Sequence, residues 1–201
     1  IIADSDRLIT HGGTVIWGKD GKQDQNWRAH VESIASIDCV QGLISNLSVQ
    51  GLILDPETFG NEFKVCVRTT ASNQMSDCKR IERVLEAEYP GRFEVSYWNS
   101  KSIDITPLGI NKKTALEHVI QEENLGDVRV ITAGDSMNDC PILSVEYFHK
   151  IAVGNAAQRL RSAVEGLPNI FFASASQPCA LGVMAGLRHY GIIDSTFECE
   201  L

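Results

Sequence analysis

The sequence contains no cluster of positive charge, no long apolar run and no closely spaced cysteine pair. Its 18 Lys and Arg residues are outnumbered by 26 Asp and Glu residues, which gives a formal net charge of -8. General nucleic-acid binding needs a cationic surface that neutralises phosphates, so this class is excluded. No stretch approaches the roughly 20 apolar residues of a membrane span, so we expect no membrane partner.

The cysteines form neither a CxxC pair nor a zinc-type spacing with histidine. There are six of them, at positions 39, 66, 78, 140, 179 and 199. We expect reduced, mostly buried thiols in a cytoplasmic protein, because a reducing compartment keeps thiols free. No signal peptide is visible, although the chain begins with Ile1 rather than Met. The sequence indicates no oligomeric state.

The first half of the chain predicts an α+β unit. Apolar residues at helical spacing predict a helix over residues 27–47, broken near Asp38, and a helix over 76–88 with Ser76 as its N-cap. Strands are expected at 7–17 (a hairpin around a glycine turn), 52–54, 62–70, 92–98 and 101–107.

After Pro107 strands and helices alternate. Helices are expected at 112–124, 140–145, 156–164 and 180–189, and strands at 128–133, 150–153 and 169–174. This alternation predicts a parallel, doubly wound sheet of the α/β class. No internal repeat or low-complexity tract interrupts it.

An acidic loop, Asp135–Asp139, follows the apolar run Val128–Ile131 in the stretch "TAGDSMNDC". Ligands of open α/β sheets bind beyond the carboxyl ends of the strands. Mg²⁺ prefers carboxylate and carbonyl oxygens, so Asp135 is a candidate ligand that Asp139 could steady. Asn138 could hydrogen-bond a substrate oxygen. The alternative is a helix start in which Asp135 or Ser136 is the N-cap and Asp139 faces the helix dipole.

Two lysines open the helix expected after "GIN". A lysine at a helix N-terminus is disfavoured by the helix dipole unless an anion lies nearby. Together with free backbone N–H groups, it makes a good phosphate site. We therefore interpret Lys112 as functional and Lys113 as a solvated surface lysine.

Lys112 followed by "GDSMND" resembles motifs III and IV of the haloacid dehalogenase (HAD) superfamily of phosphohydrolases. The segments "DRLITHGGTVIW", "NEFKVCV", "SKSIDITPLGINKKTAL", "VGNA" and "ALGVMAGLRHYG" follow the order of its sucrose-phosphate phosphatase branch, which carries a type IIB cap. The similarity spans nearly the whole chain. It implies a Rossmann-type parallel core with an inserted α+β cap, made of residues 14–106 between core segments 1–13 and 107–201.

The resemblance implies a Mg²⁺-dependent phosphatase that hydrolyses a sugar phosphate or similar small phosphorylated metabolite through an aspartyl-phosphate intermediate. In that scheme Asp135 binds Mg²⁺ and Lys112 offsets the charge of the phosphoryl group. Asp139 supports both, and Asn138 and Ser136 shape the loop.

Two further positions match residues of the branch that approach substrate. Asn155 matches a residue near the phosphate, and Lys101 matches a cap lysine that reaches toward the substrate. Ser102 follows Lys101 where sucrose phosphatases tend to carry an acid, which weakens the case for sucrose phosphate itself. Among other candidates for substrate contact, Trp98 lies on a predicted strand near Lys101 and His11 lies beside two glycines, whereas Trp27 fits the cap core.

The nucleophile that this scheme needs is expected upstream of the chain. Asp4 and Asp6 follow two apolar residues, but Arg7 and Leu8 replace the Gly and Thr of the DxDGT motif. No room is left before the cap for the helix and strand of motif II. The core is therefore expected to be incomplete here. The alternative is a truncated, non-catalytic HAD-like protein that binds a phosphorylated ligand.

Overall fold

A computed structural model describes residues 7–56, 58, 61–96, 101–126 and 129–194 of the chain. The chain divides into two compact units, Ile1–Leu125 and Gly126–Leu201. Asp4, Asp6 and Trp98 lie outside the described residues, as do parts of the strands expected at 92–98 and 128–133. Within the described ranges, no helix is both long and apolar enough to cross a membrane.

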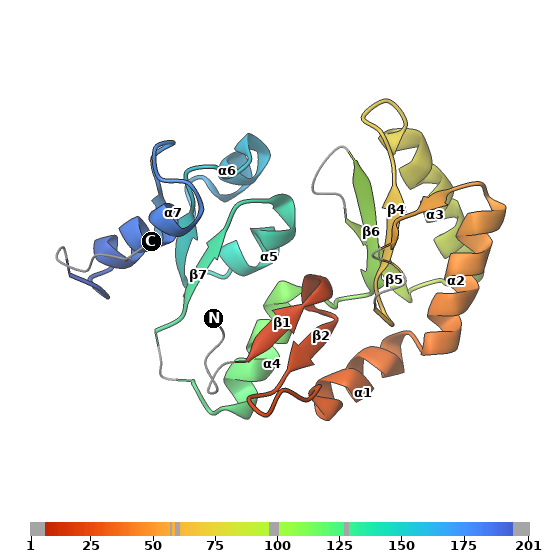
Figure 1. Cartoon of the computed structure of the whole chain (residues 1–201), viewed down its shortest axis with the longest axis horizontal. Helices are drawn as coiled ribbons and strands as arrows, with labels where there is room; N and C mark the ends of the chain where they lie inside the picture. Colours follow the sequence, from red (N-terminus) through yellow and green to blue (C-terminus); the bar gives the residue numbers. More distant parts are fainter. Residues whose placement is uncertain (1–6, 57, 59–60, 97–100, 127–128, 195–201) are drawn as a thin grey trace. The chain divides into compact units, whose positions relative to one another are not determined.

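The first unit combines a small hairpin, a mixed α+β region and one further helix (Figure 1). Its elements are β1 (Leu8–Thr10), η1 (His11–Gly13), β2 (Val15–Trp17), α1 (Gln25–Ile34), α2 (Ile37–Val49), β3 (Ile53–Leu54), β4 (Val65–Arg68), α3 (Gln74–Glu88), β5 (Phe93–Ser96), β6 (Ser102–Pro107) and α4 (Lys112–Glu122). Strands β1 and β2 pair antiparallel, and the larger sheet has the antiparallel order β3-β4-β6-β5.

Helices α2 and α3 lie on the same side of the four-stranded sheet (Figure 1). The apolar side chains of these elements form one core, with Phe63, Leu43 and Ile105 fully buried in it. Helix α4 packs against the β1–β2 hairpin and η1. Hydrophobic burial therefore joins the hairpin, α1 and α4 to the sheet as one unit.

The break in the first predicted helix is confirmed, but it lies earlier than expected. Ala35 and Ser36 adopt extended backbone conformations, and the Ser36 side chain accepts a hydrogen bond from the Cys39 N–H at 3.3 Å. Ser36 is thus the N-cap of α2. Asp38, where the break was predicted, lies inside the first turn of α2.

The predicted N-cap of the second helix is wrong. Helix α3 begins at Gln74 with Asn73 as N-cap, because the Asn73 and Gln74 N–H groups both donate to the Thr70 carbonyl. Ser76 lies one turn further on and donates its hydroxyl proton to the Asn73 carbonyl at 2.8 Å. A turn that closes on Thr70 starts the helix, and its hydrogen bonds are not visible in the apolar spacing.

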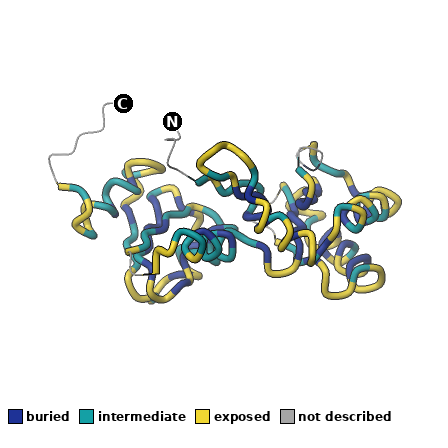
Figure 2. Tube along the Cα trace, turned by 90° about the horizontal axis from the view of Figure 1, so that it is seen from below, coloured by how far each residue is buried: buried dark blue, intermediate teal, exposed yellow. Residues whose placement is uncertain are grey.

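The second unit contains the parallel sheet that the strand–helix alternation predicts. Its elements are β7 (Ile131–Gly134), η3 (Met137–Asp139), α5 (Cys140–Leu143), β8 (His149–Ala152), α6 (Gln158–Val164), β9 (Ile170–Phe172) and α7 (Cys179–His189). The strand order is β7-β8-β9, all parallel. In Figure 2, buried stretches alternate with exposed ones along this unit as along the first.

One cation lies inside the second unit. Lys150 on β8 is fully buried, and its Nζ donates to the carbonyls of Glu146 and Pro168 at 3.2 and 2.6 Å. Burial lowers the pKa of Lys150, and Glu146 partly opposes this shift. None of the five cysteines in the described ranges forms a disulfide, as expected. The expectation that they are mostly buried is wrong, because only Cys66 and Cys78 are buried, whereas Cys39 and Cys140 are half-buried and Cys179 is exposed.

Candidate functional site

The acidic loop after β7 is organised by the carboxylate of Asp139. Oδ2 of Asp139 accepts the backbone N–H groups of Asp135 and Ser136 at 3.0 and 3.1 Å, and the Ser136 hydroxyl at 3.3 Å. The residue is buried, with 5% of its surface exposed. These bonds are the capping arrangement that the sequence left open as an alternative, with Asp139 holding the loop backbone.

Gly134 allows this arrangement because no side chain fits there. A Cβ atom at Gly134 would lie 2.4 Å from the Cβ of Asp139. The close approach lets the Asp139 carboxylate reach back over the turn to the two N–H groups. A larger residue would push this carboxylate away from the backbone it holds.

Asp135 stands exposed at the carboxyl end of β7. Its backbone carbonyl accepts the Ala157 N–H at 2.8 Å, which fixes the main chain. Its Oδ2 accepts the side-chain amide of Asn155 at a long 3.4 Å. Because Asp135 is exposed at a strand end, its carboxylate can bind a ligand that lies beyond the carboxyl ends of the parallel strands.

Asn155 connects three loops. It follows β8, its Nδ2 donates to Asp135 after β7, and its Oδ1 accepts the N–H of Cys179 at 2.7 Å, where α7 begins after β9. Beside it, the Gly154 N–H donates to the Gln177 carbonyl at 2.9 Å. The ends of all three parallel strands are thus held together by hydrogen bonds at one edge of the sheet.

Ser136 and Asn138 contact each other within the same loop. The Ser136 hydroxyl donates to Oδ1 of Asn138 at 2.6 Å, and both side chains are half-buried. The structure therefore brings together five of the predicted residues, Asp135, Ser136, Asn138, Asp139 and Asn155.

Lys112 belongs to the other unit. It is the first residue of α4 and is half-buried. The side chain of Asn111 caps this helix by accepting the Lys113 and Thr114 N–H groups at 3.0 and 3.3 Å, and Thr114 completes a capping box. The sequence analysis missed this cap, although an Asn directly before the two lysines is the usual signal.

Lys113 pairs with Glu117 one turn further along α4, at 3.5 Å, and 41% of its side chain is exposed. This position agrees with the interpretation of Lys113 as a solvated surface lysine. Lys101 is exposed just before β6, and its backbone carbonyl accepts the Thr69 N–H at 2.8 Å.

Trp27 and His11, two of the aromatic residues considered for substrate contact, differ in burial. Trp27 is 3% exposed, which confirms that it belongs to the core, and its Nε1–H donates to the Gly13 carbonyl at 2.9 Å. His11 is half-buried in η1 with a φ of 51°.

Gly13 lies against the start of α4. A Cβ atom at Gly13 would be 2.3 Å from the carbonyl carbon of Asn111 and 2.8 Å from the backbone nitrogen of Lys112.

The residues of the acidic loop fit a hard divalent cation. Asp135 offers an exposed carboxylate, and the same loop contains the side-chain amide oxygen of Asn138. Mg²⁺ is commonly held by one or two carboxylates while it keeps several waters and the phosphate oxygens of a substrate. Asp135 is the residue that would hold such an ion here.

The chain is similar in sequence to known proteins. A family model described as sucrose-6F-phosphate phosphohydrolase matches residues 2–191. The chain is 25% identical over 195 residues to a probable sucrose-phosphatase 3b of Arabidopsis thaliana, which covers 93% of the chain and 45% of that protein. It is 29% identical over 98 residues to a mannosylfructose-phosphate phosphatase of Agrobacterium fabrum, which covers 49% of the chain and 39% of that protein. The chain thus spans less than half the length of these relatives.

Solved structures share the fold. The sucrose-phosphatase from Synechocystis sp. PCC6803, solved in complex with sucrose and phosphate, superposes with a TM-score of 0.73 at 17% identity, over 94% of this chain and 75% of that one. A sugar phosphatase of HAD subclass IIB gives a TM-score of 0.60 at 14% identity, over 94% and 76% of the two chains. These matches confirm the predicted HAD-like α/β fold.

Proposed function

Because the chain belongs to the sucrose-6F-phosphate phosphohydrolase family of HAD phosphohydrolases, we propose that its protein hydrolyses the phosphomonoester of a sugar or a similar small metabolite. The proposed reaction depends on Mg²⁺ and passes through an aspartyl-phosphate intermediate. The observation that carries the proposal is the exposed carboxylate of Asp135 at a strand end, on a loop held by Asp139 and Asn155.

Each residue has a role that follows from its position. Asp135 would hold Mg²⁺, which as a Lewis acid polarises phosphoryl oxygens and offsets their charge. Lys112 would add a positive charge beside the phosphoryl group from a capped helix start. Asp139 keeps the Asp135 backbone in place before substrate binds, so little reorganisation is needed during the reaction.

The remaining predicted residues serve the substrate and the loop. We assign Asn155 to the phosphate end and Lys101 to the sugar end of the substrate. Ser136 and Asn138, which hydrogen-bond each other at 2.6 Å, keep the loop in shape.

The domain division is part of the same proposal. Residues 14–106 form the cap, and residues 1–13 and 107–201 belong to the core. In this scheme the four-stranded sheet β3-β4-β6-β5 is the centre of the cap, and β7-β8-β9 is the part of the core that carries the acidic loop. Cap residues then select the sugar, and core residues carry out phosphoryl transfer.

Separate replacement of two adjacent lysines, Lys112 and Lys113, by methionine tests the proposal. In the protein as the cell makes it, Lys112→Met should lower kcat for release of inorganic phosphate from a sugar monophosphate by at least about 100-fold, because one charge at the phosphoryl group is lost. Lys113→Met is the matched control and should leave kcat unchanged, since Lys113 faces Glu117. Equal kcat values for Lys112→Met and the wild type would contradict the assignment.

A further inference from the structure

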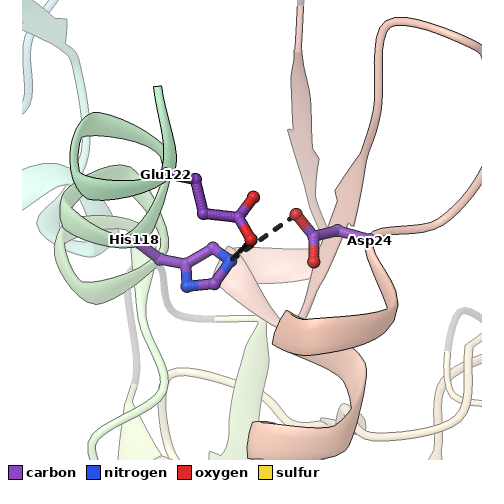
Figure 3. Close-up of side chains that lie close together, drawn as sticks. All are labelled: Asp24, His118 and Glu122. Atoms are coloured by element: carbon purple, nitrogen blue, oxygen red, sulfur yellow. Dashed lines mark ion pairs between the residues drawn. The ribbon is translucent and has the colours of Figure 1, made fainter. Parts of the chain in front are cut away.

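A second group of metal-ligating side chains lies within the first unit, apart from the acidic loop (Figure 3). Asp24 is the N-cap of α1, and His118 and Glu122 lie one turn apart on α4. Their ligand atoms all lie within 4.8 Å of one another. We call these three residues the α1–α4 cluster. The family resemblance assigns no role to any of them.

The geometry of the cluster centres on His118. Its Nε2 lies 3.5 Å from Oδ2 of Asp24 and 3.5 Å from Oε1 of Glu122. This nitrogen is buried and has no hydrogen-bond partner within the described part of the chain. A tetrahedral ion with bonds of about 2.0–2.1 Å keeps its ligand atoms about 3.3–3.4 Å apart. The two distances from Nε2 are thus long for hydrogen bonds and close to the spacing of ligands around one ion. The third pair of ligand atoms lies within 4.8 Å.

Neighbouring groups hold the two carboxylates and the imidazole of the cluster in place. Oδ1 of Asp24 accepts the Trp27 N–H at 2.9 Å, and Oε1 of Glu122 accepts the side-chain amide of Asn26 at 3.0 Å. The indole of Trp27 packs against the imidazole of His118 with ring centroids 5.1 Å apart. Such outer contacts orient ligands in known metal sites. Here they fix all three side chains in a converging arrangement before any ion binds.

Arg7 is a cation that already pairs with the carboxylates of the α1–α4 cluster. Its guanidinium donates to Oδ2 of Asp24 at 2.7 Å, to Oε2 of Glu122 at 3.1 Å and to Glu123 at 3.0 Å. Lys19 also pairs with Glu123 at 3.0 Å. Three carboxylates therefore face two cations, which leaves one net negative charge beside the imidazole. The second oxygen of Glu122, Oε1, faces His118 rather than the guanidinium.

The carboxylate of Asp24 is ionised at neutral pH. Burial by itself would raise the pKa of Asp24, but the Trp27 N–H and the Arg7 guanidinium hold it below its ordinary value. Only 4% of this side chain is exposed, against 20% for His118 and 25% for Glu122. Oδ2 of Asp24, which also pairs with Arg7, is directed at a buried imidazole nitrogen that has no hydrogen-bond partner within the described residues. Such a pair of ligand atoms is a good site for a cation.

We propose that Asp24, His118 and Glu122 bind one divalent transition-metal ion, with Zn²⁺ as the best fit. One imidazole and two carboxylates suit Zn²⁺ better than Mg²⁺ or Ca²⁺, which prefer oxygen ligands alone. A water molecule completes the tetrahedron. The ion links the start of α1 to α4, so its effect is on the stability of the first unit. The inference does not depend on the proposed phosphatase activity.

Calorimetric titration of the intact protein with Zn²⁺ tests the site. Buffer containing excess Mg²⁺ keeps the acidic loop from contributing, and a Cys179→Ser background removes the thiol that is exposed among the described residues. We expect one Zn²⁺ per chain and a higher unfolding temperature with Zn²⁺ than without. Loss of an outer contact alone weakens metal sites by about 10–100-fold, so His118→Gln should weaken binding by at least about tenfold. The matched control is His30→Gln, an exposed histidine that also packs against Trp27.

A second variant keeps the test decisive if His118→Gln fails to fold. Glu122→Gln removes one ligand charge and leaves the Trp27–His118 contact, and it should weaken Zn²⁺ binding to a similar extent. Absence of Zn²⁺ binding to the Cys179→Ser protein without further substitutions would overturn the proposal. The three residues would then form only an ion-pair network with Arg7. Equal loss of binding in His30→Gln and His118→Gln would overturn it as well.

Discussion

Replacement of Asp135 by Asn should lower kcat for release of phosphate from a sugar monophosphate by about 100- to 1,000-fold. The change keeps the shape of the side chain but removes the charge that would hold Mg²⁺, and loss of one transition-state contact of this kind costs about 10²–10³ in kcat. The backbone of the acidic loop should stay in place, because Asp139 holds it through main-chain N–H groups. Steady-state kinetics on the protein as the cell makes it give this measurement.

Asp38→Asn is a suitable control for this variant. Asp38 is an exposed carboxylate in the first turn of α2 and has no place in the proposed reaction. Its replacement should leave kcat unchanged. A Mg²⁺ titration of both variants separates metal binding from catalysis, since only Asp135→Asn should bind Mg²⁺ more weakly. Wild-type kcat in Asp135→Asn would show that the acidic loop has no part in phosphoryl transfer.

Gly13→Ala should lower the free energy of unfolding by about 3 kcal/mol. Gly13 has a φ of +107°, where an L side chain is strained by about 1–2 kcal/mol. In addition, the new Cβ would lie 2.3 Å from the backbone of Asn111, and such overpacking adds about 1–3 kcal/mol. Urea unfolding followed by circular dichroism measures the change.

The neighbouring glycine provides the matched control. Gly12 also has a positive φ, +73°, but a Cβ atom there would meet nothing within 4 Å. Gly12→Ala should therefore cost only the backbone strain, about 1 kcal/mol. Equal losses in the two variants would mean that the contact between Gly13 and the start of α4 does not support the fold. A larger loss in Gly13→Ala supports a tight junction directly beside Lys112.

Apolar periodicity predicted most elements of the fold, because burial of one helix face leaves a 3.6-residue pattern in the sequence. The parallel strands β7, β8 and β9 were predicted from a different signal, because buried strands leave short apolar runs between the helices. Helix ends were harder to place. The start of α3 depends on two hydrogen bonds to the Thr70 carbonyl, and the start of α2 on the Ser36 side chain. None of these three hydrogen bonds changes the apolar pattern.

The candidate site could be predicted only where its residues are close in sequence or match a known motif. Asp135 and Asp139 are four residues apart, so their proximity was evident, but the direction of the Asp139 carboxylate toward the loop backbone was not. The α1–α4 cluster was missed because its members come from distant segments, Asp24 at the start of α1 and His118 and Glu122 on α4. The spacing of His118 and Glu122 by four residues on one helix was the available signal.

Phosphate release by the intact protein from a panel of sugar monophosphates, with Mg²⁺ and with a chelator, tests the central proposal most directly. The proposal predicts release from at least one member of the panel, loss of that release when the chelator removes Mg²⁺, and its return when Mg²⁺ is added in excess. No release from any sugar monophosphate in Mg²⁺, or release that the chelator leaves unchanged, would contradict a Mg²⁺-dependent sugar phosphatase built on Asp135 and Lys112.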